Sequence, residues 1–168
     1  PEWNTASICQ WSPVNGEIVG TSADWVLNTS SAAAAAAAAV NRIENENPHA
    51  VFVHLDDPDY AGHNSGFSPT SPAYLNAISE MDVQVGFMVS ALQSRVNYAE
   101  ENWMVLVTTD HGGSGTSHGG NTEEERRVFI IASSPTLPVE VVHRDTLWIA
   151  PESADCLALE SVLNLAGD

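Results

Sequence analysis

The chain has 168 residues, a length that fits one domain with a substantial buried core. It carries 22 acidic side chains against five arginines and no lysine, so its formal net charge is -17 at pH 7. This charge disfavours binding to nucleic acid and to anionic membrane surfaces. Because 43% of the residues are apolar, the composition excludes a disordered, collagen-like or coiled-coil chain, and no apolar run is long enough to predict a membrane span.

Four short runs of apolar, often β-branched residues predict strands, at residues 5–9, 51–55, 103–109 and 128–132. The second and third runs are nearly continuous in apolar residues, which is typical of strands covered on both faces of a parallel sheet. Since the loops after these two strands are rich in acidic residues and histidines that we expect to lie together, we expect the strands to be central neighbours in one sheet.

Helical patterns separate the predicted strands. Between residues 74 and 92 the apolar positions recur every three or four residues and form one face of a helix, made of Leu75, Ile78, Met81, Val85, Met88 and Leu92. Ser71 suits the N-cap of that helix and Pro72 its first turn. A last helix is expected from Pro151 to Gly167. This alternation predicts a single α/β domain over residues 1–168, with a mostly parallel central sheet and helices on both faces.

Residues 32–39 are eight consecutive alanines, a run that favours a helix continuing into Arg42 and Ile43. The run has no alternation of apolar and polar residues with which to dock a helix on a sheet. Two interpretations therefore stay open. The alanines are either a genuine helix or placeholders at positions whose side chains were not identified.

Two loops hold most of the residues suited to metal binding, and each follows one of the two central strands. Their carboxylates and imidazoles are Asp56, Asp57, Asp59, His63, Asp110, His111 and His118. In an open α/β sheet, ligands bind beyond the carboxyl ends of the strands, where both loops are expected. Carboxylate and imidazole donors together suit Zn²⁺, or Mn²⁺ and Mg²⁺ where carboxylates dominate. The pattern predicts a metal site shared by the two loops.

The order of these motifs resembles that of the alkaline phosphatase superfamily, most closely its branch of type I phosphodiesterases and nucleotide pyrophosphatases. The residues that carry the resemblance are Asp59-Tyr-Ala-Gly-His63, Thr108-Thr-Asp-His-Gly-Gly113, His118-Gly-Gly, Glu125-Arg126 and Ile149-Ala-Pro151. The resemblance extends over most of the chain from about residue 48 onward. It implies an alkaline-phosphatase-like α/β fold.

The resemblance also implies a phosphate-ester hydrolase with two divalent metal ions, most simply Zn²⁺, with Mn²⁺ or Mg²⁺ as alternatives. The implied ligands are Asp59, His63 and a later histidine for one ion, and Asp110 and His111 for the other. We take His118 as the later histidine, because the glycines around it allow its loop to fold back over the site. His143, further along the chain, is the alternative.

Members of this family also have an aspartate that completes the second site and a Thr or Ser nucleophile on the same metal. Both lie upstream of the segment that resembles residues 5–13, so we expect both to precede Pro1 and expect no catalytic nucleophile within this chain. On this reading the N-terminal portion of the domain is missing from the segment. The chain is then the C-terminal part of a catalytic domain and works with the remainder of that domain on a small phosphate ester.

Three functions stay open at this level. A metal-dependent phosphodiesterase or phosphatase is favoured. A non-catalytic extracellular structural or assembly protein on the same fold, as a homo-oligomer or larger assembly, also fits the acidic, lysine-free composition. The third is a phosphosugar mutase of the same superfamily.

Three further residues bear on the environment of the protein. Asn28 begins an N-glycosylation sequon, Asn28-Thr29-Ser30, and together with the acidic composition it favours an extracellular or periplasmic location. Cys9 and Cys156 allow one disulfide at most. Two buried thiols are the expected state, because free cysteine is commonly buried as a small apolar residue.

Overall fold

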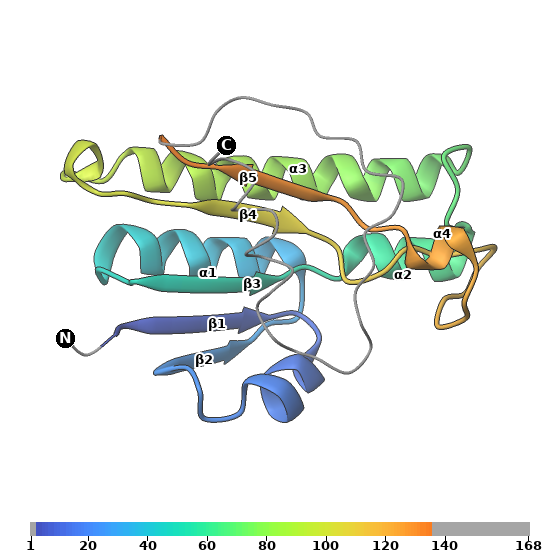
Figure 1. Cartoon of the computed structure of the whole chain (residues 1–168), viewed down its shortest axis with the longest axis horizontal. Coiled ribbons are helices and arrows are strands. Elements are labelled where there is room, and N and C mark those ends of the chain that lie inside the picture. Colours follow the sequence, from blue (N-terminus) through green and yellow to red (C-terminus); the bar gives the residue numbers. More distant parts are fainter. Residues whose placement is uncertain (1–2, 136–168) are drawn as a thin grey trace, which may run out of the picture.

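The computed structural model describes residues 3–135, in which strands and helices alternate along the chain (Figure 1). In chain order the elements are β1 (Thr5–Cys9), η1 (Val14–Val19), β2 (Trp25–Asn28), α1 (Ala32–Asn45), β3 (Ala50–His54), α2 (Asp57–Ser65), α3 (Pro72–Gln93), η2 (Tyr98–Glu100), β4 (Val105–Thr108), α4 (Glu123–Arg126) and β5 (Ile130–Ser133). The helix expected from Pro151, together with His143 and Cys156, lies outside the described residues. Within residues 3–135, no helix combines the length and apolar character needed to cross a bilayer.

The first three strands form a parallel sheet in the order β2–β1–β3. Ile8 of the central strand pairs with Leu27 on one side and with Val53 on the other. Each connection between these strands passes through a helix, η1 after β1 and α1 after β2. The predicted α/β fold with a parallel sheet flanked by helices is therefore confirmed.

The two faces of this sheet carry different contacts. On one face Ile8 is fully buried against Ala35 and Ala39 of α1. On the opposite face the Ser7 hydroxyl donates to Oδ1 of Asn15 in η1 at 2.6 Å, and the Cys9 thiol donates to the same oxygen at 3.2 Å. Cys9 is a free, buried thiol, as predicted, and burial raises its pKa.

The alanine run forms the first part of α1, and Ser31 caps the helix by accepting a hydrogen bond from the Ala34 amide at 3.2 Å. The buried residues of α1 are Ala32, Ala35, Ala36, Ala39 and Ile43, which recur at helical spacing. The expectation that this run lacks a docking face is therefore wrong. The small side chains let the helix approach the sheet and α3 closely, so their size takes the place of alternating polarity.

The prediction that residues 51–55 and 103–109 are paired neighbours in one sheet is wrong for the described residues. β3 belongs to the three-stranded sheet, whereas β4 pairs antiparallel with β5 in a second sheet. The two strands lie near each other because both pack on the same helices. Ile43 from α1 and Ala91 and Leu92 from α3 form a buried hydrophobic cluster. Val51 of β3 and Val105 of β4 both contact this cluster. Figure 1 shows β3 and β4 ending on the same side of the molecule, so the loops that follow them can still meet.

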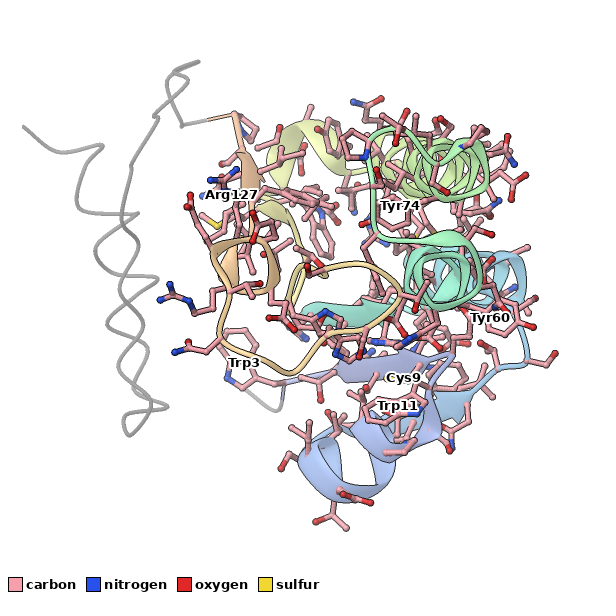
Figure 2. The ribbon with its side chains drawn as sticks, turned by 90° about the vertical axis from the view of Figure 1, so that its right-hand side faces the viewer. Trp3, Cys9, Trp11, Tyr60, Tyr74 and Arg127 are labelled. Atoms are coloured by element: carbon pink, nitrogen blue, oxygen red, sulfur yellow. The ribbon has the colours of Figure 1, made fainter. Side chains whose placement is uncertain are left out.

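Burial along β3 and β4 also differs from the prediction of strands covered on both faces. Phe52 is 50% exposed and Leu106 is 43% exposed, while the neighbours of each along its strand are less exposed. The reason is that α1, α2 and α3 lie together on one side of the strands, as the view in Figure 2 shows. Within the described residues, these two strands therefore present an apolar face to solvent.

The predicted long helix is confirmed as α3, with Ser71 as its N-cap and Pro72 in its first turn. Its apolar face is buried only in part, because Leu75 is 44% exposed and Ile78 is 42% exposed. In this first half of the helix the buried residue is Ala77. Here α3 packs against α2 as well as α1, so a small residue occupies the contact that larger ones were expected to make.

Arg95, just after α3, links three segments of the chain. Its guanidinium donates to both carboxylate oxygens of Glu101 at 2.8 Å and to the carbonyl of Ile43. The guanidinium also lies 5.5 Å from the ring centroid of Trp103, whose indole donates to Glu101 at 2.6 Å. The bonds from Arg95, followed by the bond from Trp103, lower the pKa of Glu101 to about 2.

Glu101→Gln should lower the free energy of unfolding by about 1–3 kcal/mol at neutral pH, because Arg95 loses its counter-charge while only 8% exposed. Folding lowers the pKa of Glu101 from the value of 4.5 that it has in the unfolded chain. The charged carboxylate therefore contributes its full stabilisation of the fold above pH 4.5, and this stabilisation is lost as the pH falls toward 2. Urea denaturation of both proteins at several pH values measures the difference. It should shrink as the pH falls below 4.5, and a difference independent of pH would contradict the role of the ion pair.

Candidate metal centre

The segment after β3 carries the first two candidate ligands. We expected a loop here, but the structure has the helix α2, which has Pro58 and two acidic residues in its first turn. Asp59 and His63 are four residues apart and therefore lie on one face of this helix. Oδ2 of Asp59 is 3.4 Å from Nε2 of His63. The helical spacing thus brings a carboxylate and an imidazole together.

His118 reaches the same place from the loop between β4 and α4. Its Nε2 lies 3.3 Å from Oδ1 of Asp59. The loop turns back through a short antiparallel bridge between Ser114 and Ser117. One ligand atom from each of Asp59, His63 and His118 lies within 4.8 Å of the others, so the structure brings together the three residues assigned to one ion.

One carboxylate oxygen of Asp59 is in a position that a bound cation would stabilise. Its Oδ1 is buried and has no hydrogen-bond partner among the described residues. Burying a carboxylate oxygen that accepts no hydrogen bond costs free energy unless a positive charge binds it. One carboxylate and two imidazoles also form a donor set that Zn²⁺ accepts. The residues present therefore fit a divalent metal ion.

Backbone carbonyls fix the orientation of two of the histidines. Nδ1 of His63 is 2.9 Å from the carbonyl oxygen of Thr116, and Nδ1 of His111 is 2.7 Å from that of Gly112. A carbonyl can only accept, so each Nδ1 carries the proton and donates it. This leaves the lone pair of Nε2 free in both rings, which is the arrangement that a histidine ligand of a metal requires.

Asp110 and His111 lie beside this cluster, directly after β4. The ring of His111 stacks on that of His118, with centroids 3.8 Å apart and planes at 19°. Nε2 of His111 is 3.7 Å from Oδ1 of Asp110, whose side chain is 79% exposed. Within the described residues, these two side chains find no third ligand that completes a cluster of their own.

Asp56 and Asp57, the other acidic candidates, do not join the three-residue cluster. Asp57 instead accepts a hydrogen bond from Nε2 of Gln10 at 2.6 Å, and the Asp56 amide donates to Oε1 of Gln10 at 2.8 Å. Gln10 thereby fixes the start of α2 beside the end of β1. Burial raises the pKa of Asp56, and the charges of Asp59, Asp57 and Asp110 act in the same direction. The concentrated negative charge favours a bound cation nearby.

Phe67 is a residue of the site that the sequence analysis missed. Its ring stands edge-on to His63 at 5.4 Å and to His118 at 6.0 Å, measured between centroids. It fills the space beside Gly62 and Gly113, where a Cβ added to either glycine would collide with it. The sequence signal for such a contact was the glycine in each of the two ligand motifs, Gly62 and Gly113, since glycine allows another group to approach the main chain closely.

Gly113→Ala should displace the Phe67 ring and weaken Zn²⁺ binding by the full-length protein about 10–100-fold, the usual cost of disturbing the residues that support metal ligands. Competition with a chromophoric chelator measures the affinity. Gly16→Ala is the matched control, because no atom lies within 4 Å of a Cβ at that position. Equal affinities in the two variants would show that Phe67 does not support the site.

Comparison with known families agrees with the fold. The family model for type I phosphodiesterase / nucleotide pyrophosphatase matches residues 2–132. The chain therefore belongs to the type I phosphodiesterase / nucleotide pyrophosphatase family, which confirms the resemblance seen in the motifs. A search of individual curated proteins gave no significant match. Family membership indicates phosphate-ester hydrolysis as the general activity.

Proposed function

We propose that the full-length protein is a metal-dependent hydrolase of phosphate esters and that Asp59, His63 and His118 hold one of its metal ions. The family supports the hydrolysis of phosphate esters. The observation that carries the metal site is the convergence of one ligand atom from each of the three residues, together with the buried Oδ1 of Asp59, which accepts no hydrogen bond among the described residues. Zn²⁺ suits this donor set best, with Mn²⁺ or Mg²⁺ as the alternatives.

Asp110 and His111 are proposed to contribute to a second ion, together with an aspartate and a Thr or Ser nucleophile of the same catalytic domain. Two such ions would neutralise phosphoryl charge and activate the attacking hydroxyl. The stacking of His111 on His118 holds the two sets of ligands next to each other. The carbonyls of Gly112 and Thr116 keep the imidazoles of His111 and His63 in the tautomer that leaves Nε2 free.

Net charge adds a second reason for metal dependence. The chain has a formal charge of -17, and Asp56, Asp57, Asp59 and Asp110 all lie close to the proposed site. An anionic phosphate ester is repelled by these carboxylates unless cations offset them. We therefore expect substrate binding, and not only the chemical step, to depend on metal.

The test is hydrolysis of bis-p-nitrophenyl phosphate by the full-length protein before and after treatment with a chelator. Activity should disappear with the metal and return on addition of Zn²⁺, Mn²⁺ or Mg²⁺. Hydrolysis that a chelator does not affect would contradict the proposal. A metal-loaded protein inactive toward phosphodiesters, phosphomonoesters and sulfate esters alike would favour the structural or assembly role instead.

We also propose an extracellular or periplasmic location, with Asn28 as a glycosylation site in a eukaryotic host. Asn28 is exposed at the end of β2, and its Oδ1 accepts a hydrogen bond from Nδ2 of Asn15 at 2.7 Å. Its own amide nitrogen is the atom that a glycan would modify. A mass shift that a glycosidase reverses, and that Asn28→Gln abolishes, would support the assignment.

A further inference from the structure

We propose that Glu125 is a positioning residue for the metal centre, because it fixes both ends of the loop between β4 and α4, which carries His111 and His118. This inference rests on the proposed function, since it concerns the same site. Glu125 lies in the short helix α4 and does not belong to the three-residue ligand cluster. Its main chain holds the start of the loop, next to His111, and its side chain holds the end of the loop, after His118.

The carboxylate of Glu125 holds the end of the loop, after His118, through three hydrogen bonds. Its Oε1 accepts from the Gly120 amide at 2.9 Å. Its Oε2 accepts from the Thr122 amide at 3.0 Å and from the Thr122 hydroxyl at 2.8 Å. These donors follow His118 closely in the chain, so the carboxylate fixes the path by which the main chain leaves that histidine.

The main chain of the same residue holds the start of the loop. The Gly112 amide, next to His111, donates to the carbonyl oxygen of Glu125 at 2.8 Å. A Cβ on Gly112 would collide with the carbonyl oxygen of Glu124. A Cβ on Gly120 would lie only 2.6 Å from Oε2 of Glu125. Both ends of the loop therefore approach α4 more closely than a residue with a side chain allows.

The consequence is a fixed spacing between His111 and His118. Their rings stack at 3.8 Å, and Nε2 of His118 reaches to 3.3 Å from Asp59. Glycine is abundant in the segment around His118, so this loop has many conformations to lose when it orders. The hydrogen bonds to Glu125 restrict the conformations of this loop, which its glycine-rich sequence does not do by itself.

A purely local role for Glu125 has to be distinguished from this one. Glu125 and Thr122 form a capping box, a common device that stabilises the first turn of a helix. The bonds to Gly120 and Gly112 are additional to that box and hold the two ends of the loop that carries both histidines. Loss of a cap lowers stability, whereas loss of a positioning residue also changes the metal site.

The experiment measures Zn²⁺ affinity and the visible spectrum of the Co²⁺-substituted full-length protein. Glu125→Ala should weaken Zn²⁺ binding about 10–100-fold and alter the Co²⁺ bands. Glu125→Gln should recover part of the affinity, because its amide oxygen still accepts one of the bonds. Glu124→Ala is the matched control on the same exposed turn and should keep the wild-type affinity and spectrum.

Wild-type affinity and an unchanged Co²⁺ spectrum in Glu125→Ala, even with a lowered melting temperature, would overturn the proposal and leave only a helix cap. If that variant does not fold, Gly120→Ala decides by the same two measurements, because its Cβ displaces the carboxylate while Glu125 remains in place. A wild-type protein that binds no Zn²⁺, Mn²⁺ or Mg²⁺ would instead refute the proposed function, and this inference with it.

Discussion

Asp59→Asn should remove nearly all phosphodiester hydrolysis by the full-length protein, a loss on the order of 10³-fold or more. Asp59 is the residue around which the site is built, with one oxygen 3.4 Å from Nε2 of His63 and the other 3.3 Å from Nε2 of His118. The amide of asparagine keeps the shape of the side chain but removes the single negative charge of the three ligands. The bound ion should be lost with that charge.

Two measurements check this result, the rate with bis-p-nitrophenyl phosphate and the metal content after removal of free metal. Asp82→Asn provides the control, because Asp82 is exposed on α3 and makes the same change of charge outside the cluster. It should keep both the rate and the metal. If Asp59→Asn also keeps both, the assignment of Asp59 as a ligand is wrong.

Asp110→Ala should cause a loss of rate of the same order, yet leave the ion at Asp59 in place. Asp110 lies outside the three-residue cluster, and its exposed carboxylate accepts a hydrogen bond from the amide of its neighbour His111 at 3.1 Å. Removing an exposed side chain costs little stability, so the loss of rate would reflect the second ion. Metal content should fall by about one ion per chain, as expected for one of two sites.

The comparison between the two variants separates the sites. Asp59→Asn should lose the ion that His118 helps to hold, and Asp110→Ala should keep it. Co²⁺ bands that are lost in the first variant and are retained in the second, as the contribution of the remaining ion, would support this division. Full activity of Asp110→Ala would contradict a two-ion mechanism and leave a single ion at Asp59.

Much of the fold could be predicted because the signals are local. The strand expected at residues 5–9 has the same bounds as β1, and the helix expected at 74–92 lies within α3. β2 was missed because only three apolar residues, Trp25 to Leu27, stand between polar ones. The antiparallel pairing of β4 with β5 could not be predicted, because it depends on how the strands pack on distant helices.

For the site, too, features that depend on neighbouring residues could be predicted, and features that depend on contacts between distant segments could not. The family resemblance implied Asp59 and His63 as ligands of one ion, and the glycines around His118 indicated a loop able to return to them. The helix α2 was missed although a spacing of four residues suits a helix. Phe67 could not be found, and Glu125 was noted only as part of the family resemblance, because the contacts of both become visible only in the fold.

The most direct test of the central claim is the position of the ion in crystals of the Zn²⁺-loaded full-length protein, located by anomalous scattering at the zinc edge. We predict a peak bound by a carboxylate oxygen of Asp59 and by Nε2 of both His63 and His118, with Zn–N distances of about 2.0–2.1 Å. A peak bound by His143 while His118 points away would contradict the choice of the third ligand. The absence of any peak at Asp59 would contradict the metal centre itself.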